Sequence, residues 1–361
     1  MRKILILIGS FDIGGTEKQL FNILKYIDKS FDIHICLIEK RGAMYEDFSK
    51  LNITIHHAFD DSKKKIVKLF NIFLNLKKIY NKVKPSIIHF YLPAAYILGG
   101  LCFFFKRKVK FIMSRRSLNL YQQKYFFIKW IEIFLHKRMN FIIANSRIIL
   151  NQLISEEYVD PKKCRLIYNG VLKKKIKKKK ENQITKILFL ANILNYKNHK
   201  KVVEECKNMK CKNKWRINCV GNFSDEVLLN SLKNLIKKYK LHKNIFFLGS
   251  MLDVSDELES SDIGILVSTE EGLSNSLLEY LSYSLPVIAT DVGGNSEIVQ
   301  NEVNGFLVKS NDSVHFSKVL SNLIDDNNLR YVFSRNGHKL VSKKYNLDNC
   351  VKEYFKFYRS I

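Results

Sequence analysis

The sequence predicts an α/β fold made of two Rossmann-like, doubly wound parallel-sheet domains. Its 361 residues exceed the usual size of a single core, because one domain typically takes about 150 residues. Short apolar segments alternate with segments of helical periodicity in both halves, and strands separated by helices form βαβ units with a parallel sheet. A hydrophobic fraction of 46% is enough for sizeable cores and excludes a disordered chain.

The first half begins with a short apolar run, Lys3–Ile8, and a glycine-containing loop, Gly9–Gly15. Alternating or β-branched runs predict the strands that follow, and apolar residues at helical spacing predict the helices. The further strands are Phe31–Ile38, Ser86–Phe90, Phe111–Ser114 and Phe141–Asn145; the helices are Thr16–Ile27, Lys63–Lys82 and a segment near Tyr125–Met139.

Two segments of this half also allow a membrane interpretation. Ile87–Phe105 is long and apolar enough to resemble a membrane span. Pro93 and the Gly99-Gly100 pair interrupt it, which favours a buried strand that leads into a core helix. The basic helix Lys63–Lys82 could lie on a membrane surface, but its place between two strands favours packing on the sheet.

A lysine-rich run separates the two halves. Lys173–Lys180 has seven lysines in eight residues, which must be solvated, so 171–185 is interpreted as a linker rather than a nucleic-acid-binding tail. The second alternating series has strands at Lys186–Ala191, Arg216–Gly221, Asn244–Gly249, Ile263–Ser268, Pro286–Thr290 and Gly305–Val308. An amphipathic helix near Leu347–Tyr358 ends the chain.

Charge and cysteine content narrow the function classes. The formal net charge of +27 favours an anionic partner, which leaves nucleic acid, an acidic membrane surface, phosphorylated substrates or a general lysine bias open. The seven cysteines show no C-x-x-C pair and read as free thiols of a reducing cytosol. The apolar run in MRKILILIG is too short for a secretory signal, so we expect a cytoplasmic protein.

The richest stretch for chemistry is Ser268–Glu297. A helix opens at Ser274, Asn275 and Ser276, whose side chains and backbone N–H groups can hold an anion. Glu279 lies one turn further on, where a carboxylate can accept two hydrogen bonds from a vicinal diol such as a ribose. Glu271, in the preceding loop, can reach a sugar hydroxyl. Spacing alone leaves solvated carboxylates beside an ordinary capped helix equally open.

The order of several motifs resembles retaining glycosyltransferases of family four. The run from Glu271-Gly272 to Glu279, then Pro286–Thr290, Gly293-Gly294, Glu297 and Asn304-Gly305, is similar to the donor domain of that family. Gly14-Gly15-x-Glu17, Asn145-Ser146, Asn169–Val171, Phe247–Gly249 and Asp262 extend the resemblance over nearly the whole chain.

The resemblance implies a GT-B architecture in which the last helix returns to the first domain. The domains are then 1–170 with a helix at about 345–361 on the acceptor side, and 186–344 on the donor side. Glu279 is expected to bind the donor ribose and Glu271 the transferred sugar, while backbone after Gly249 borders the base. Gly14 and Gly15 are expected to let the chain approach the diphosphate closely.

Lys197 is the expected cation for the departing diphosphate, because no Asp-x-Asp metal motif stands at a strand end. Ala191-Asn192-Ile193-x-x-x-Lys197 matches the family's Gly-Arg-Leu-x-x-x-Lys segment, but Asn192 replaces the arginine and supplies only a neutral amide. The family's histidine near the donor sugar is missing too, so Arg115 or Arg116, with Arg116 preferred, is expected to contact phosphate or acceptor. His89 is interpreted as a satisfied core histidine rather than a site group.

The expected reaction moves a hexose or N-acetylhexosamine from a nucleotide diphosphate sugar, with UDP favoured, and retains the anomeric configuration without a metal or cofactor. A lipid-linked or envelope-glycan acceptor is expected, with peripheral attachment to an anionic inner membrane face as a hypothesis. Two alternatives stay open: a relative that binds sugar nucleotide without transferring it, and a basic nucleic-acid-binding protein. The sequence contains no recognisable nucleic-acid-binding motif, so no specific nucleic acid is expected as a partner.

Overall fold

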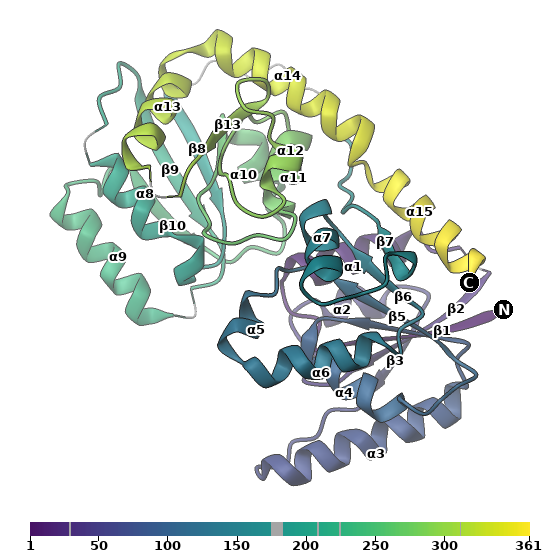
Figure 1. Ribbon diagram of the computed structural model, residues 1–361. Coiled ribbons are helices and arrows are strands. Elements are labelled where there is room, and N and C mark those ends of the chain that lie inside the picture. The colour runs from purple at the N-terminus through teal and green to yellow at the C-terminus, as the bar shows by residue number, and fades with distance from the viewer. Residues whose placement is uncertain (29, 175–182, 208, 224, 311) are drawn as a thin grey trace. The chain divides into compact units, whose positions relative to one another are not determined.

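The computed structural model describes residues 1–28, 30–174, 183–207, 209–223, 225–310 and 312–361 (Figure 1). Within them the chain forms two compact units, one of Met1–Asn169 with Leu347–Ile361, the other of Gly170–Asn346. The sequence places the boundary at 170 and the returning helix at about 345. Most of the predicted basic linker, residues 175–182, lies outside the described residues.

The N-terminal unit is built on a parallel sheet of seven described strands in the order β3-β2-β1-β4-β5-β6-β7. This is a doubly wound order, because the chain turns back at β1 and continues on its other side from β4. The strands are β1 (Arg2–Ile8), β2 (Phe31–Leu37), β3 (Thr54–His57), β4 (Ile87–Tyr91), β5 (Lys110–Arg115), β6 (Phe141–Ala144) and β7 (Cys164–Leu166).

Helices cover both faces of this sheet. Successive side chains of a strand point to opposite faces, so in β1 Ile4 and Ile6 join one core cluster and Leu5 and Leu7 the other. The helices α1 (Gly15–Lys25), α2 (Tyr45–Ser49) and α15 (Leu347–Ser360) contribute to the first cluster. The second takes side chains from α3 (Lys65–Val83), α4 (Pro93–Phe103), α6 (Phe126–His136) and α7 (Arg147–Ser155), and α5 (Leu120–Lys124) precedes α6.

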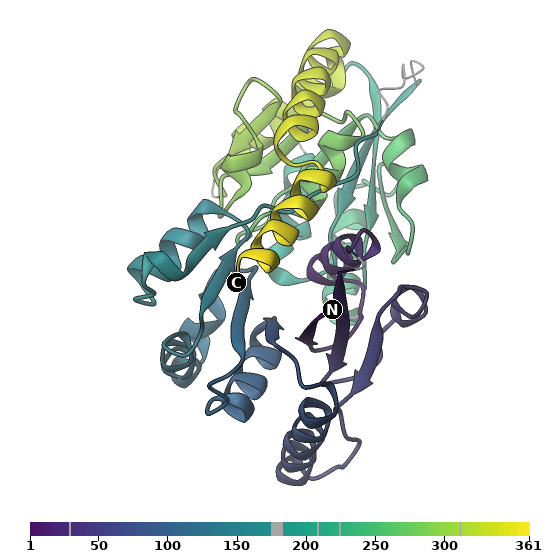
Figure 2. The same cartoon turned by 90° about the vertical axis from the view of Figure 1, so that its right-hand side faces the viewer.

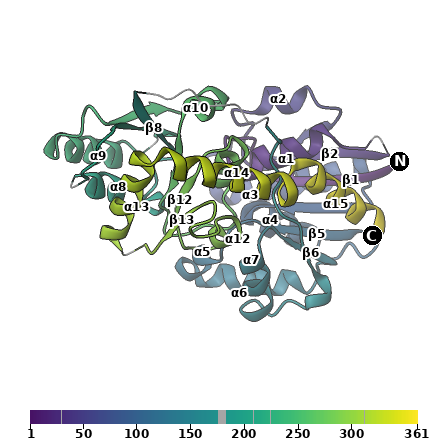
Figure 3. The same ribbon diagram turned by 90° about the horizontal axis from the view of Figure 1, so that it is seen from above.

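The last helix of the chain, α15, packs beside α1 (Figure 3). The Tyr358 hydroxyl lies 2.6 Å from Nδ1 of His89, and Nε2 of His89 lies 2.8 Å from the Ser114 hydroxyl. Arg2 donates to the Tyr358 carbonyl oxygen at 2.7 Å. His89 is fully buried with both ring nitrogens bonded, which confirms the core interpretation.

The apolar segment Ile87–Phe105 is a strand and a core helix. Strand β4 lies in the middle of the sheet, and α4 packs on it through glycine. A Cβ at Gly99 would lie 2.6 Å from the side chains of Leu7 and Phe90, and one at Gly100 would lie 3.0 Å from Leu135 of α6. The glycines that interrupt the apolar run therefore permit close helix packing. Among the described residues, no helix combines the length and hydropathy needed to cross a bilayer.

A buried ionic network ties α4, α6 and the segment after α7 to the end of β5. Nη2 of Arg115 lies 2.9 Å from Oε2 of Glu132 and 2.5 Å from Oε2 of Glu157. His136 bonds Glu157 at 2.7 Å through Nε2 and the Tyr96 hydroxyl at 2.7 Å through Nδ1. All of these side chains are buried, so this part of the core is polar and depends on complete pairing.

The second unit repeats the doubly wound plan with a parallel sheet of six described strands, β10-β9-β8-β11-β12-β13. All six were predicted. The strands are β8 (Ile184–Leu190), β9 (Lys214–Val220), β10 (Ile245–Gly249), β11 (Ile263–Leu266), β12 (Val287–Thr290) and β13 (Gly305–Val308). The helices are α8 (His199–Cys206), α9 (Glu226–Lys238), α10 (Ser255–Ser260), α11 (Asn275–Ser282), α12 (Asn295–Ile298), α13 (Ser313–Asp325) and α14 (Asn327–Lys344).

Candidate functional site

The second unit brings Lys197 and Glu271 together at its topological switch point. The strand order reverses between β8 and β11, and Lys197 and Glu271 stand in the loops that follow these two strands. Open parallel sheets bind ligands at this point, outside the carboxyl ends of their strands. Nζ of Lys197 lies 2.6 Å from Oε1 of Glu271, which also accepts a hydrogen bond from the Ser268 hydroxyl at 2.7 Å.

Sequence spacing places each of these residues in the site but does not predict their pairing. In the unliganded chain the Glu271 carboxylate is engaged by Lys197, and the expected contact of Glu271 with the transferred sugar stays a prediction. Both side chains are mostly buried, at 17% and 11% exposure, so the pair is only partly screened by water. An incoming anion must compete with Glu271 for the ammonium group.

The loop that carries Glu271 is held by backbone contacts. The Gly294 amide donates to the Gly272 carbonyl oxygen at 2.9 Å, and the Thr269 amide donates to that of Tyr196 at 2.7 Å. Gly293 has a φ of +55°, and a Cβ there would lie 1.7 Å from the Glu271 carbonyl oxygen. Only glycine fits this left-handed position at such close approach. The Gly293-Gly294 motif therefore fixes the position of Glu271.

Helix α11 begins beside this loop. Ser274 is its N-cap, with the hydroxyl accepting a hydrogen bond from the Leu277 amide at 3.3 Å. The Ser276 hydroxyl donates to the Leu190 carbonyl oxygen at 2.8 Å, so in the unliganded chain its proton is already engaged. Its amide still lacks an acceptor within the helix, because Ser276 lies in the first turn. Asn275, half-buried, is the first residue of α11.

The position of Glu279 follows from the anchoring of α11. The buried Tyr280 hydroxyl accepts a hydrogen bond from the Leu190 amide at 2.6 Å and donates to the Ile265 carbonyl oxygen at 3.2 Å. This ties the helix to β8 and β11. Glu279 is partly exposed one turn after Asn275 and Ser276, on nearly the same face. A carboxylate, an amide-rich helix start and an ammonium group are thus held at one end of the sheet.

Asn192 follows β8 and Gly249 ends β10, two strands of the same sheet that are separated by β9. Oδ1 of Asn192 accepts a hydrogen bond from the Asn222 amide at 2.9 Å, so this side chain also fixes the loop after β9. Gly249 has a φ of +85°, and a Cβ there would meet nothing within 4 Å. Glycine is favoured at Gly249 by its backbone angle rather than by crowding, and the space beside it is open.

His199 is a neighbour of Lys197 that the sequence analysis does not single out. Its ring stacks on Phe189 with centroids 4.2 Å apart and is 3% exposed. Burial, followed by the nearby Lys197 charge, lowers the pKa of His199 to about 4. The local sequence around His199 does not predict this stacking, because Phe189 lies ten positions earlier in the chain. The ring is therefore neutral at physiological pH.

We expect His199 to make folding sensitive to acid. The unfolded chain binds the imidazole proton near pH 6.5 and the folded chain only near pH 4, so stability falls as pH drops through that window, by about 3 kcal/mol at its end. A His199→Phe variant keeps the stacking and removes the proton. Urea unfolding at pH 7.5 and 4.5 should show a smaller loss for the variant than for the wild type; equal losses would contradict the assignment.

In the N-terminal unit, the buried carboxylate of Glu17 in α1 lies beside the glycine loop after β1. Gly14 is the N-cap of α1, and a Cβ there would lie 2.2 Å from Oε2 of Glu17. Burial, with Asp12 and Glu39 nearby, raises the pKa of Glu17 to about 7. A Cβ at Gly14 would therefore displace the Glu17 carboxylate, a contact that the sequence does not reveal. Gly15, the first residue of α1, is exposed.

Arg115 and Arg116 have different environments at the end of β5. Arg115 is buried in the network of Glu132 and Glu157, so the alternative that it contacts a substrate is corrected. Nη2 of Arg116 donates to Oδ1 of Asn169 at 2.7 Å, and Nη1 donates to the Tyr354 hydroxyl at 3.3 Å. Within the part of the chain that the structure describes, Arg116 has only neutral hydrogen-bond partners and contacts no carboxylate that would neutralise its charge.

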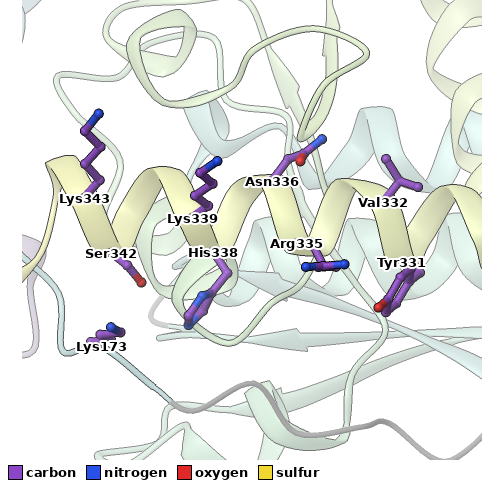
Figure 4. Close-up of a pocket in the computed structure, with 9 residues that line it drawn as sticks. All are labelled: Lys173, Tyr331, Val332, Arg335, Asn336, His338, Lys339, Ser342 and Lys343. Atoms are coloured by element: carbon purple, nitrogen blue, oxygen red, sulfur yellow. The ribbon is translucent and has the colours of Figure 1, made fainter.

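A separate hollow of about 620 Å³ lies along α14 in the second unit (Figure 4). Figure 4 shows Tyr331, Arg335 and His338 on the side of α14 that faces Lys173. The lining is Lys173, Tyr331, Val332, Arg335, Asn336, His338, Lys339, Ser342 and Lys343. It is strongly basic but shares no residue with the candidate site described above.

Comparison with known families assigns both halves of the chain. The family "Glycosyltransferase Family 4" matches residues 13–172, and "Glycosyl transferases group 1" matches residues 172–340. The chain is 28% identical to the UDP-Gal:alpha-D-GlcNAc-diphosphoundecaprenol alpha-1,3-galactosyltransferase of Escherichia coli over 77% of this chain and 76% of the relative.

Two further proteins match over essentially the full length. The N-acetylgalactosamine-N,N'-diacetylbacillosaminyl-diphospho-undecaprenol 4-alpha-N-acetylgalactosaminyltransferase of Campylobacter jejuni is 24% identical over 99% of both chains. The crystal structure of Anabaena HepE in complex with UDP and glucose superposes with a TM-score of 0.88 at 18% identity and covers 100% of both chains. With two parallel Rossmann-like sheets and both family domains in order, the chain belongs to the family-four, group 1 glycosyltransferases of GT-B fold.

Proposed function

We propose that this glycosyltransferase moves a hexose or N-acetylhexosamine from a nucleotide diphosphate sugar, with UDP favoured, to a lipid-linked or envelope-glycan acceptor. The observation that carries the proposal is the Lys197–Glu271 pair at the switch point, beside the start of α11. The diphosphoundecaprenol named in two relatives supports a lipid-linked acceptor, and the UDP in the HepE structure supports the donor.

In the proposed donor complex, the diphosphate takes the Lys197 ammonium away from Glu271. The carboxylate is then available to accept a hydrogen bond from a hydroxyl of the transferred sugar. Glu279 accepts hydrogen bonds from the two ribose hydroxyls, and the amide of Ser276 contributes its dipole to the phosphates. Arg116 is assigned to the acceptor or the phosphate. Until a donor binds, the ion pair thus keeps the charges of Lys197 and Glu271 neutralised by one another.

The proposed reaction proceeds on one face of the sugar ring, with retention. The bond between the anomeric carbon and the diphosphate oxygen breaks, and its electron pair stays on that oxygen. The acceptor hydroxyl forms the new carbon–oxygen bond on the same face, and its proton passes to the departing phosphate oxygen. Lys197 stabilises the charge that develops on the diphosphate, so the protein itself supplies the cation.

Thermal unfolding with nucleoside diphosphates and a transfer assay test this proposal together. A site-bound nucleotide at about a hundred times its Kd stabilises the fold by about 2.7 kcal/mol, a rise in melting temperature of roughly 5 °C. We expect the largest rise with UDP and product formation with a UDP-sugar and a diphosphoundecaprenol-linked glycan. A shift without product from any donor would identify a binding-only relative, and no shift with any nucleotide would reject the donor site.

Glu279→Ala is expected to weaken nucleotide binding about ten- to a hundredfold, because charge-assisted hydrogen bonds contribute about 1.5–3 kcal/mol. The measurement is titration calorimetry with UDP and with uracil. Only the ribose-containing ligand should lose affinity. Glu226→Ala removes an exposed carboxylate of the same unit and should bind like the wild type. Unchanged UDP affinity in Glu279→Ala would contradict the ribose assignment.

A further inference from the structure

Three helices of the N-terminal unit, α3, α4 and α6, form one layer on one face of its sheet (Figure 1 and Figure 2). α4 lies between the other two. The Cys102 thiol approaches the carbonyl oxygen of Phe73 in α3 at 3.8 Å, and the rings of Phe104 and Phe134 of α6 stack with centroids 4.8 Å apart. The layer is therefore continuous from α3 to α6.

The outer side of this layer leaves large apolar side chains in solvent. Phe105 is 89% exposed, Ile66 84% and Phe127 82%. Soluble proteins rarely leave so many large apolar side chains together on one surface unless a partner covers them. We define the outer apolar face by six exposed residues: Ile66, Phe70, Phe105, Phe126, Phe127 and Trp130.

Helix α6 buries Leu135 in the core but also leaves bulky aromatic side chains on its outer side. Its inner side carries Glu132 and His136, which are buried in the ionic network, while Phe127 and Trp130 point outward. The rings of Phe126 and Trp130 lie 6.0 Å apart and cover one another rather than the core. A surface helix normally turns its apolar stripe to the core, so the outer stripe of α6 needs another apolar environment.

Helix α3 is apolar on two sides. Ile72 and Leu76 are buried in the core of the unit, whereas Ile66 and Phe70, one turn apart, form a second stripe that faces solvent. Core packing explains the first stripe only. The sequence prediction that this helix packs on the sheet is confirmed, but this packing does not account for Ile66 and Phe70.

The segment that forms this face is rich in basic residues, although Asp60, which precedes it, accepts a hydrogen bond from Asn71 of α3 at 3.0 Å. Residues 62–131 contain sixteen lysines and arginines and no aspartate or glutamate. Lys106, Arg107 and Lys108 follow Phe105 directly and are exposed. The next acidic residue, Glu132, is buried against Arg115 and cannot offset this charge at the surface. The segment that carries these exposed apolar side chains is therefore strongly basic.

We propose that the outer apolar face docks on a bilayer surface that contains anionic lipid. Trp and Phe rings with interleaved lysines suit the headgroup layer, where the rings meet hydrocarbon and the ammonium groups meet phosphate. A second copy of the chain is a poor partner, because a two-fold interface would place the two basic faces against each other. The biological use of this docking, access to a lipid-linked acceptor, rests on the proposed function; the docking itself does not.

Vesicle flotation tests the docking directly. We expect the chain to float with vesicles of equal parts phosphatidylglycerol and phosphatidylcholine, and to stay unbound with phosphatidylcholine alone. Replacing Phe105, Phe127 and Trp130 with serine should lower the partition coefficient at least about tenfold. The matched control is Val227→Ser with Leu252→Ser, which removes two exposed apolar residues of the other unit and should change nothing.

Fluorescence can then report the contact at one residue. The chain has two tryptophans, so Trp215→Phe leaves Trp130 as the only one. Its emission should shift to shorter wavelength with the anionic vesicles and be quenched by brominated acyl chains. An unshifted Trp130 in the presence of bound vesicles would overturn the assignment of this face.

Transfer assays separate this inference from the proposed function. The triple serine variant should glycosylate a short-chain, water-soluble acceptor at the wild-type rate and lose activity toward an acceptor embedded in vesicles. Vesicle binding without any transfer would leave the docking standing and reject the function. Equal vesicle binding by the variant and the wild type, or a change in its oligomeric state or RNA retention instead of its vesicle binding, would overturn the proposal.

Discussion

Replacing Lys197 with alanine is expected to lower kcat about a hundredfold, which corresponds to about 3 kcal/mol of transition-state stabilisation. Lys197 is the basic side chain paired with Glu271 at the switch point, where we place the departing diphosphate. The measurement is steady-state transfer with a saturating nucleotide sugar. A kcat within a factor of two of the wild type would reject the role of Lys197.

Lys200 is the matched control for Lys197. It follows three residues later, is 64% exposed and pairs with Glu204 across one helical turn at 3.7 Å. Lys200→Ala should transfer at the wild-type rate, because exposed pairs of this kind contribute little to stability. A double-mutant cycle with Glu271→Gln separates two roles of Lys197. If Lys197 only orients Glu271, its removal adds nothing in that background; if it contacts the diphosphate, a large loss remains.

The central strands were predictable because both of their faces are buried. Such strands form continuous apolar runs, as in Ile4–Ile8 and Ile263–Leu266, and these runs stand out in the sequence. The strands that the sequence analysis missed are the two edges of the first sheet. Thr54–His57 is polar and only partly buried, and Cys164–Leu166 has three residues, too short for a pattern to develop.

The residue types of the site were predictable, but their partners were not. Ser274, Asn275 and Ser276 are all good helix caps, so spacing cannot tell that Ser274 caps α11 and that Ser276 bonds to β8. Lys197 and Glu271 are 74 positions apart and meet only because β8 and β11 are neighbours in the sheet. That pairing could have been inferred from the doubly wound strand order, in which the first and fourth strands of a domain are adjacent.

The sequence around Glu132 contains an indication of the buried ionic network. Glu132 is the single carboxylate in the largely apolar run FFIKWIEIFLH, and a carboxylate in such a run indicates either exposure or a buried partner. The structure shows a buried partner, Arg115. Adjacent Arg115 and Arg116 look equivalent in sequence, but strand β5 ends between them, so one side chain enters the core and the other does not.

Replacing Arg115 with methionine is expected to destabilise the N-terminal unit by about 3–5 kcal/mol, because two buried carboxylates lose their common partner. Although burial opposes ionisation of Glu157, the Arg115 charge and the His136 hydrogen bond outweigh it and lower the pKa of this carboxyl group. Without Arg115 the carboxylate remains in a medium that solvates it poorly. Urea unfolding followed by the fluorescence of Trp130, in the Trp215→Phe background, measures the change.

We attribute the lower stability of Arg115→Met to unpaired charge rather than to lost packing, and a second substitution separates these two causes. Glu157→Gln in the Arg115→Met background removes one unpaired charge while keeping the side-chain volume, so it should recover about 1–3 kcal/mol. Arg116→Met is the matched control: its partners are the neutral Asn169 and Tyr354, so no buried charge is stranded and the loss should be smaller. If the double variant is as unstable as Arg115→Met alone, the network stabilises this unit through shape and not through its charges.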